Sequence, residues 1–295
     1  MIYTLRNEHL TVKIHDKGAT LWSIKDSDGT EYLWQGNPQY WQDRAPNLFP
    51  YIARMTKGRY TLNGKTYKMD IHGFAKDMTF KAKQMSDTYV IFTIMYTQET
   101  YKQYPYKFTF SVVYKLDGNR IKVSYLVRNN DDKTMYFGLG AHPGFNVPIE
   151  EGLAFEDYYL EFDSSSDAKR VEFSNDCFVT GKLSTFLLED GNRLSLKHSL
   201  FDDDAIVLKD MAKSVTLLSK KGNKGICVTY PDMSYLGIWH MPRTDAPYIC
   251  IEPWSSLPSR KDVIEDLEKQ PGLVALESGC EHENHWSIEI LPNKR

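Results

Sequence analysis

Residues 108–127, FTFSVVYKLDGNRIKVSYLV, decide the fold class of this sequence. Apolar residues recur at every second position in both halves of the stretch, and this period predicts half-buried β-strands. The segment Leu116–Asn119 lies between the two halves and contains an Asp-Gly pair, which is typical of a tight turn between antiparallel strands. The stretch is therefore predicted to form two strands joined by a turn.

The same pattern recurs along the chain. Leu10–Ile14 and Tyr89–Ile94 alternate in the same way, and turn formers interrupt the strand-like runs about every ten residues. Many short strands joined by tight turns predict an all-β sandwich or barrel. Helix signals are few, and the best candidate is Ser259–Gln270, which has a cap, an apolar stripe and a Pro-Gly terminus. No linker or repeat divides the chain, so residues 1–295 are predicted to form a single domain.

Composition excludes several classes of protein. The 295 residues carry a formal charge of -3, which argues against a main partner that is nucleic acid or an anionic membrane. The near-neutral net charge also favours a neutral ligand over a strongly anionic one. Aromatic residues make up 13% of the chain, which favours strands and flat, sugar-like ligands.

Neither a signal peptide nor an apolar run of the ~18 residues that span a bilayer is visible, so a cytoplasmic protein without a membrane partner is expected. The four cysteines are widely spaced, at positions 177, 227, 250 and 280. This spacing favours buried free thiols in a reducing compartment over a disulfide framework.

Two histidines occupy similar settings. His72 and His142 each end a strand-like run and precede turn formers and a phenylalanine. Ends of strands are where a rigid scaffold presents functional side chains, and imidazole exchanges protons near neutral pH. A structural role, with each ring hydrogen-bonded to a loop carbonyl, is the alternative interpretation. The repetition of the setting favours function.

A carboxylate and an arginine are the next candidates. Glu252 ends the apolar run Tyr248–Ile251 and is followed by Pro253 and Trp254, an environment that predicts a raised pKa and suits a general base. An exposed last residue of an edge strand is the alternative. Arg54 lies in an apolar stretch, where a guanidinium must be paired or face a ligand.

Metal and cofactor signatures are absent from the sequence. Cys280, His282 and His285 are spaced loosely like metal ligands, but the polar stretch Glu281–His285 is better interpreted as a solvated loop. Neither a glycine-rich phosphate loop nor a Gly-x-Ser-x-Gly motif is present. Neither a metal nor a cofactor is expected.

Four segments together resemble the aldose 1-epimerase (galactose mutarotase) superfamily, and the opening residues 32–41 resemble its LacX-like branch. The segments are Asn47–Arg54, His72–Phe74, Gly138–Pro143 and Cys250–Trp254. The resemblance runs in order over nearly the whole chain. It implies a large antiparallel β-sandwich, the supersandwich, with one or two short helices and a sugar cleft on one sheet.

The resemblance also implies roles for individual residues. His142 is similar to the general acid that protonates the ring oxygen, and Glu252 to the general base that takes the proton of the anomeric hydroxyl. His72 and Arg54 resemble sugar-binding residues of the cleft. Asp203 or Asp204 is the counterpart of a substrate-binding aspartate. Apart from the resemblance, Trp254 lies beside a polar segment, so its ring is a candidate to line the cleft and stack on a sugar face.

The implied activity is interconversion of the α and β anomers of an aldose, with a small sugar as the partner and a monomer or homodimer as the assembly. An acid and a base at opposite edges of the ring, with Glu252 ionised and His142 protonated, suffice for ring opening. A sugar sensor without turnover is one alternative. A hexose-6-phosphate epimerase is another, with a phosphate at Arg44, Lys76 or Arg243. A glycosidase or lyase is weaker, because only one carboxylate is well placed.

Overall fold

The stretch that decides the fold class folds as predicted in the computed structural model, which describes residues 1–165 and 167–291. Strands β9 (Phe108–Asp117) and β10 (Arg120–Asn129) pair antiparallel across a two-residue loop. Gly118 in this loop has a φ of 59°, a left-handed conformation that glycine adopts without steric cost. Side chains of β10 alternate between buried and more exposed positions, so the period-two interpretation is confirmed.

Strands β9 and β10 belong to a nine-stranded antiparallel sheet with the order β17-β14-β19-β20-β24-β10-β9-β8-β7. Its other members are β7 (Lys81–Ser86), β8 (Tyr89–Met95), β14 (Tyr158–Phe162), β17 (Arg193–Ser195), β19 (Ser214–Ser219), β20 (Gly225–Thr229) and β24 (Glu281–Leu291). The polar stretch Glu281–His285 was interpreted as a solvated loop, and this is wrong. It begins β24 and pairs with β10 along one side, whereas β20 pairs with β24 only from Ser287 onward, so the register with β10 makes this polar stretch a strand.

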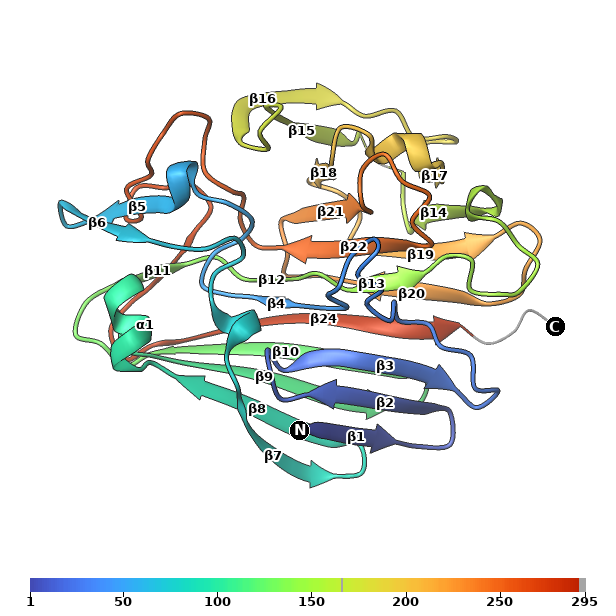
Figure 1. The fold of residues 1–295 in the computed structure, drawn as a ribbon, viewed down its shortest axis with the longest axis horizontal. Helices are drawn as coiled ribbons and strands as arrows, with labels where there is room; N and C mark the ends of the chain where they lie inside the picture. Colours follow the sequence, from blue (N-terminus) through green and yellow to red (C-terminus); the bar gives the residue numbers. More distant parts are fainter. Residues whose placement is uncertain (166, 292–295) are drawn as a thin grey trace.

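A second antiparallel sheet has the order β16-β15-β18-β21-β22-β12-β4, with β13 also paired to β22. Its strands are β4 (Asn47–Leu48), β12 (Gly140–Ala141), β13 (Gly144–Asn146), β15 (Lys169–Phe173), β16 (Val179–Thr185), β18 (Ile206–Lys209), β21 (Tyr235–Trp239) and β22 (Tyr248–Trp254). In Figure 1, β21 and β22 lie above β24 and β10. Ile251 of β22 and Tyr125 of β10 belong to the same buried core, so the two sheets pack face to face.

Smaller elements complete the fold. The strands form one three-stranded and two two-stranded sheets: β1 (Ile2–Arg6), β2 (Leu10–His15) and β3 (Thr20–Asp26); β5 (Arg59–Leu62) with β6 (Lys65–Lys68); and β11 (Met135–Phe137) with β23 (Val274–Leu276). The helices are α1 (Gln98–Gln103) and the 3-10 turns η1 (Thr56–Gly58), η2 (Ala75–Asp77), η3 (Phe155–Asp157) and η4 (His198–Phe201). The predicted antiparallel β-sandwich with short helices is confirmed. Across residues 1–165 and 167–291, no helix has the length and apolar character that a membrane span requires.

The helix predicted over Ser259–Gln270 is wrong, because this segment consists of turns and irregular backbone. Its backbone groups are bonded elsewhere: Thr61 of β5 donates to the Glu265 carbonyl at 2.8 Å and accepts from the Leu267 N–H at 2.9 Å. Asp262 has a φ of 60°, which a right-handed helix excludes. Tertiary pairing thus overrides the apolar stripe that resembled a helix face.

The cysteines are free, as expected, but they differ in burial. Cys250 is buried, Cys177 and Cys227 are half-buried, and Cys280 is exposed. The expectation of four buried thiols is therefore correct only for Cys250. Burial follows position in the fold: Cys250 lies on the central strand β22, whereas Cys280 precedes β24 at the edge of a loop.

Candidate functional site

Glu252 is placed by the centre of the second sheet. It lies on β22, a strand buried at every position, and its residue is only 1% exposed. Gly237 of β21 stands opposite it, and a Cβ at that position would come within 3.2 Å of the Glu252 Cβ. The glycine therefore leaves the carboxylate room beside its partner strand. The alternative of an exposed edge-strand residue is excluded for Glu252.

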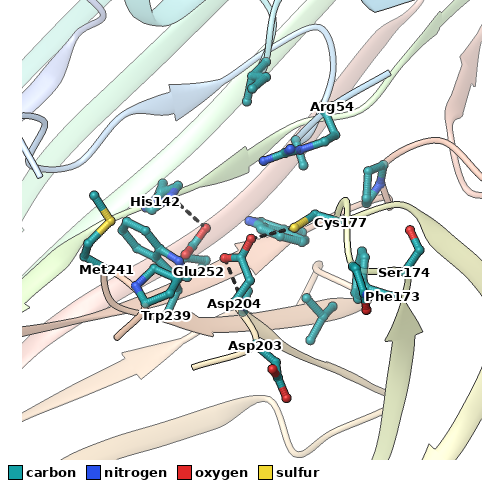
Figure 2. Close-up of a pocket in the computed structure, with 18 of the residues that line it drawn as sticks. Arg54, His142, Phe173, Ser174, Cys177, Asp203, Asp204, Trp239, Met241 and Glu252 are labelled. Atoms are coloured by element: carbon teal, nitrogen blue, oxygen red, sulfur yellow. Dashed lines mark hydrogen bonds and ion pairs between the residues drawn. The ribbon is translucent and has the colours of Figure 1, made fainter. Parts of the chain in front are cut away.

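His142 directly follows the two-residue strand β12, and its backbone N–H donates to the Pro46 carbonyl at 3.0 Å. Its imidazole stacks on Trp41 with ring centroids 4.8 Å apart and meets Trp239 edge-on at 5.6 Å. Its Nε2 lies 3.3 Å from Oε2 of Glu252 (Figure 2). The predicted acid and base are therefore immediate neighbours, and the expectation that they lie at opposite edges of a sugar ring is wrong.

Burial sets the protonation of this pair. It lowers the pKa of His142 to about 3. It raises the pKa of Glu252 well above its ordinary value, and the nearby Asp204 adds to the rise. Burial therefore favours the neutral form of both groups, in which the one proton of the pair lies on the carboxyl. The same burial disfavours the form with Glu252 ionised and His142 protonated, and Arg54 forms no ion pair with Glu252 among the described residues.

His72 lies beside His142, with the two ring centroids 5.4 Å apart and the rings nearly perpendicular. It sits in a turn with a φ of 66°, not at the end of a strand as predicted, since β6 ends at Lys68. Its Nδ1 accepts a hydrogen bond from the Ala53 N–H at 3.1 Å, so the ring proton must be on Nε2. Burial is the main cause of a pKa well below the ordinary value, so His72 is a neutral donor.

Asp204 lies on the opposite wall of the site, and two hydrogen-bond donors fix the orientation of its carboxylate. The Cys177 thiol donates to Oδ2 of Asp204 at 2.7 Å, and the Ala205 N–H donates to Oδ1 at 3.0 Å. Burial raises the pKa of Cys177 to about 11, so the thiol keeps the proton that it donates. In Figure 2 the Asp204 carboxylate lies toward Glu252, whereas the exposed Asp203 points away from it.

These side chains line a single cleft of about 920 Å³. Every residue predicted for the site lies along it: Arg54, His72, His142, Asp203, Asp204, Glu252 and Trp254. A smaller hollow of about 470 Å³ continues past His72 and His142 and is lined by Lys76. Of the three residues proposed for a phosphate, Arg243 lines the cleft, whereas Lys76 is paired with Asp77 and the Arg44 guanidinium bonds the Trp22 carbonyl.

Sequence reasoning missed several lining residues, among them Cys177, Phe173 and Arg170. Cys177 is 27 positions from its partner Asp204, and no local pattern marks the pair. Phe173 and Arg170 lie on β15, a strand that reaches the cleft only through the order of the second sheet. These contacts depend on topology, which the sequence pattern does not specify.

Unpartnered polar atoms concentrate at the cleft. Within the described residues, buried atoms without a hydrogen-bond partner include Nδ1 of His142, Oε2 of Glu252 and Nε1 of Trp254. Buried polar groups are normally bonded, because an unmade bond costs about 1–3 kcal/mol. An imidazole nitrogen, a carboxyl oxygen and an indole N–H held together in this way are suited to a polar, hydroxyl-rich ligand.

The sequence profile of the aldose 1-epimerase family matches residues 1–284. The chain belongs to the aldose 1-epimerase family. It is 37% identical to the chromosomal protein LacX of Lactococcus lactis subsp. lactis, over 99% of this chain and 100% of LacX. The plasmid-encoded LacX of the same organism matches at the same identity and coverage.

Solved structures of similar proteins agree with this membership. A galactose mutarotase related enzyme from Lactobacillus acidophilus superposes with a TM-score of 0.94 at 34% identity, covering 100% of this chain and 98% of that one. A galactose mutarotase-like protein from Lactobacillus casei gives 0.94 at 33% identity, with 99% and 100% covered. At 22% identity, a galactose mutarotase-like protein from Clostridium acetobutylicum, covering 99% and 95%, shares the fold with a TM-score of 0.78.

Proposed function

We propose that this member of the aldose 1-epimerase family interconverts the α and β anomers of an aldose. The observation that carries the proposal is the buried pair His142–Glu252, whose Nε2 and Oε2 atoms lie 3.3 Å apart at the wall of the cleft. The two oxygens that exchange protons in this reaction, O1 and O5, are both bonded to C1. Two adjacent proton carriers therefore match two adjacent oxygens.

The mechanism follows from the single proton of the pair. Ring opening requires Glu252 to accept the O1 proton while His142 donates a proton to O5, so it starts from the ion-pair form. The opened aldehyde rotates about C1–C2. Closure then needs the carboxyl of Glu252 to donate to O1 and neutral His142 to accept from O5, which regenerates the starting form. Burial favours the neutral pair, which is the form that performs closure. Transfer of one proton from the Glu252 carboxyl to His142 produces the ion-pair form, which opens the ring.

The surrounding residues fit roles in binding. His72 offers its Nε2–H to a ring or hydroxyl oxygen, and Asp204 offers its carboxylate to sugar hydroxyls from the opposite wall. Arg54 lines the cleft and forms no ion pair within residues 1–165 and 167–291, so its guanidinium is available to a further hydroxyl. Trp41 and Trp239 flank His142 and restrict its ring.

The test is polarimetry of freshly dissolved single anomers of glucose, galactose and other aldoses, with the variants Glu252→Gln and His142→Asn. Removing either proton carrier should reduce kcat by about 10²–10⁴. The double variant should be no slower than the single variants, because the two groups act as a unit. Saturable sugar binding together with mutarotation at the buffer rate in the wild type would overturn catalysis and favour a sugar sensor.

A phosphorylated hexose is a second candidate substrate. Arg54, Arg170 and Arg243 line the cleft, and in the part of the chain that the structure describes none of them forms an ion pair. Guanidinium groups bind phosphate with paired hydrogen bonds. The kcat/KM for a hexose and for its 6-phosphate decides between the candidates, and Arg243→Ala should weaken only the phosphorylated substrate.

A further inference from the structure

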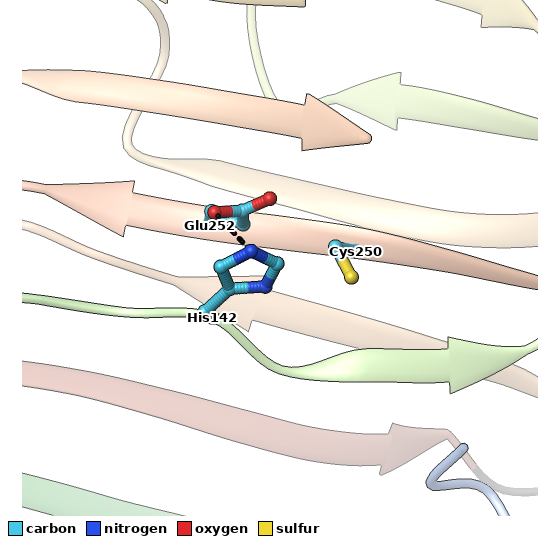
Figure 3. A group of neighbouring side chains, drawn as sticks. All are labelled: His142, Cys250 and Glu252. Atoms are coloured by element: carbon cyan, nitrogen blue, oxygen red, sulfur yellow. Dashed lines mark ion pairs between the residues drawn. The ribbon is translucent and has the colours of Figure 1, made fainter. Parts of the chain in front are cut away.

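A third ligand-type side chain lies beside the His142–Glu252 pair. Cys250 precedes Glu252 by two positions on β22, and residues two apart on a strand project from the same face. Figure 3 shows the Cys250 and Glu252 side chains beside the ring of His142. One nitrogen, one sulfur and one oxygen from these three buried residues lie within 4.8 Å of one another.

The spacing fits a tetrahedral zinc ion. Zinc binds imidazole nitrogen and carboxylate oxygen at about 2.0–2.2 Å, so two such ligands of a tetrahedral ion lie roughly 3.4 Å apart. Nε2 of His142 and Oε2 of Glu252 are 3.3 Å apart without any adjustment. The Cys250 sulfur lies within 4.8 Å of the other two ligand atoms, and a zinc–sulfur bond of about 2.3 Å requires it to move closer to them.

The proposed ligand atoms are not bound to other protein groups. Oε2 of Glu252 is buried and accepts no hydrogen bond from the described residues, although it lies near His142. The Cys250 side chain is fully buried, and none of the hydrogen bonds of the described chain involves its sulfur. His142 and Glu252 line the cleft, from which an ion would enter, and the third side chain, Cys250, is fully buried next to them.

We propose that His142, Glu252 and Cys250 form an inhibitory binding site for a borderline-soft divalent cation, for which Zn²⁺ is the probe. Binding releases the thiol and carboxyl protons to solvent and occupies both Nε2 and Oε2. Neither atom can then exchange a proton with a sugar. The inhibition rests on the proposed mutarotation, whereas the binding does not.

Binding is tested by titrating the wild-type protein with Co²⁺, which takes up zinc sites and reports a thiolate ligand by a sulfur-to-cobalt charge-transfer band. The band should form in the wild type and in Cys280→Ser, which removes the exposed thiol. It should be absent in Cys250→Ser and Cys250→Ala, with circular dichroism verifying that each variant is folded. Absence of the band in the wild type would overturn the proposal even if the protein has no epimerase activity.

Inhibition is tested by mutarotation at increasing Zn²⁺, with each variant normalised to its own metal-free rate. Losing one ligand should raise the half-inhibitory Zn²⁺ concentration at least about 10-fold in Cys250→Ala and leave it unchanged in Cys280→Ser. Mg²⁺, which prefers oxygen ligands, should not inhibit. Equal Zn²⁺ sensitivity of Cys250→Ala and wild type would contradict the proposed ligand set, whereas a wild type without mutarotation would contradict only the proposed function.

Discussion

At the residue scale, the site depends on where one proton resides. His142 and Glu252 are both removed from solvent, and burial shifts their pKa values in opposite directions. The sequence identified both residues and the raised pKa of Glu252. It did not predict that the two would be in contact, because they lie 110 positions apart, His142 directly after β12 and Glu252 on β22, and only the fold brings these strands together.

The pH dependence of kcat/KM follows from these shifts. Activity requires one proton on the pair, so it falls when a second proton is added at low pH and when the only proton is lost at high pH. Since the pKa of His142 is lowered to about 3, the acid limb should lie well below the ordinary histidine range. A rate profile with an acid limb near pH 6.5 would contradict a buried, neutral His142.

Cys177 is predicted to act as a positioning residue for Asp204. Cys177→Ala removes the donor at 2.7 Å, and a lost hydrogen bond of this kind should raise KM about 5- to 10-fold with little change in kcat. In Cys177→Ser, KM should stay close to the wild-type value, because the serine hydroxyl still donates a hydrogen bond to Asp204. Cys280→Ala is the matched control, and an unchanged KM in Cys177→Ala would exclude the role.

At the scale of elements, strand pairing determines which side chains meet. Strand β10 was predictable because an exposed face and a buried face impose period two on its sequence. Strand β9 is buried throughout Phe110–Tyr114, and the turn that joins it to β10 is what marks it as the partner strand. The segment Ser259–Gln270 was not predictable, since its backbone partners are Thr61 and Val179, far away in the chain. Local pattern therefore predicts strands but not the segments whose conformation is fixed by distant backbone groups.

Substitution of Gly237 tests whether the pairing of β21 with β22 matters for the site, because β21 leaves space at this position for the Glu252 side chain. In Gly237→Ala the new methyl group would lie 3.2 Å from both the Glu252 Cβ and the Trp254 ring, so the carboxylate must shift. Displacements of this kind cost up to about 100-fold in rate, and we expect kcat to fall at least 10-fold.

The matched control is Gly225→Ala on β20 of the other sheet, where the new methyl group also crowds its neighbours. This variant should lower the free energy of unfolding but keep the kcat of the folded protein. Equal kcat values in the two variants would show that the space beside Glu252 does not matter.

At the scale of the whole molecule, the sandwich also buries a histidine that does not line the cleft, His240. His240 is fully buried, its Nε2 lies 3.1 Å from Nδ1 of His198, and burial lowers its pKa to about 4. The sequence offered no signal for this pair, because His198 and His240 meet through η4 and the end of β21.

Stability should therefore depend on His240 in a defined pH window. A lowered pKa means that the unfolded chain takes up a proton near pH 6.5 while the folded chain resists until about pH 4. The stabilising contribution is complete above pH 6.5 and is lost as the pH falls toward 4, by at most about 3 kcal/mol. In denaturant unfolding, the free energy of unfolding should fall less between pH 6.5 and pH 4 in His240→Asn than in wild type. An equal fall in both proteins would refute the role of His240.

The central claim is that one buried pair serves both oxygens of the anomeric carbon, and a crystal structure with galactose or glucose bound tests it most directly. The account predicts O1 within about 2.6–3.2 Å of a Glu252 oxygen and O5 within the same range of Nε2 of His142. A sugar bound in the cleft with its anomeric carbon away from this pair would contradict the account.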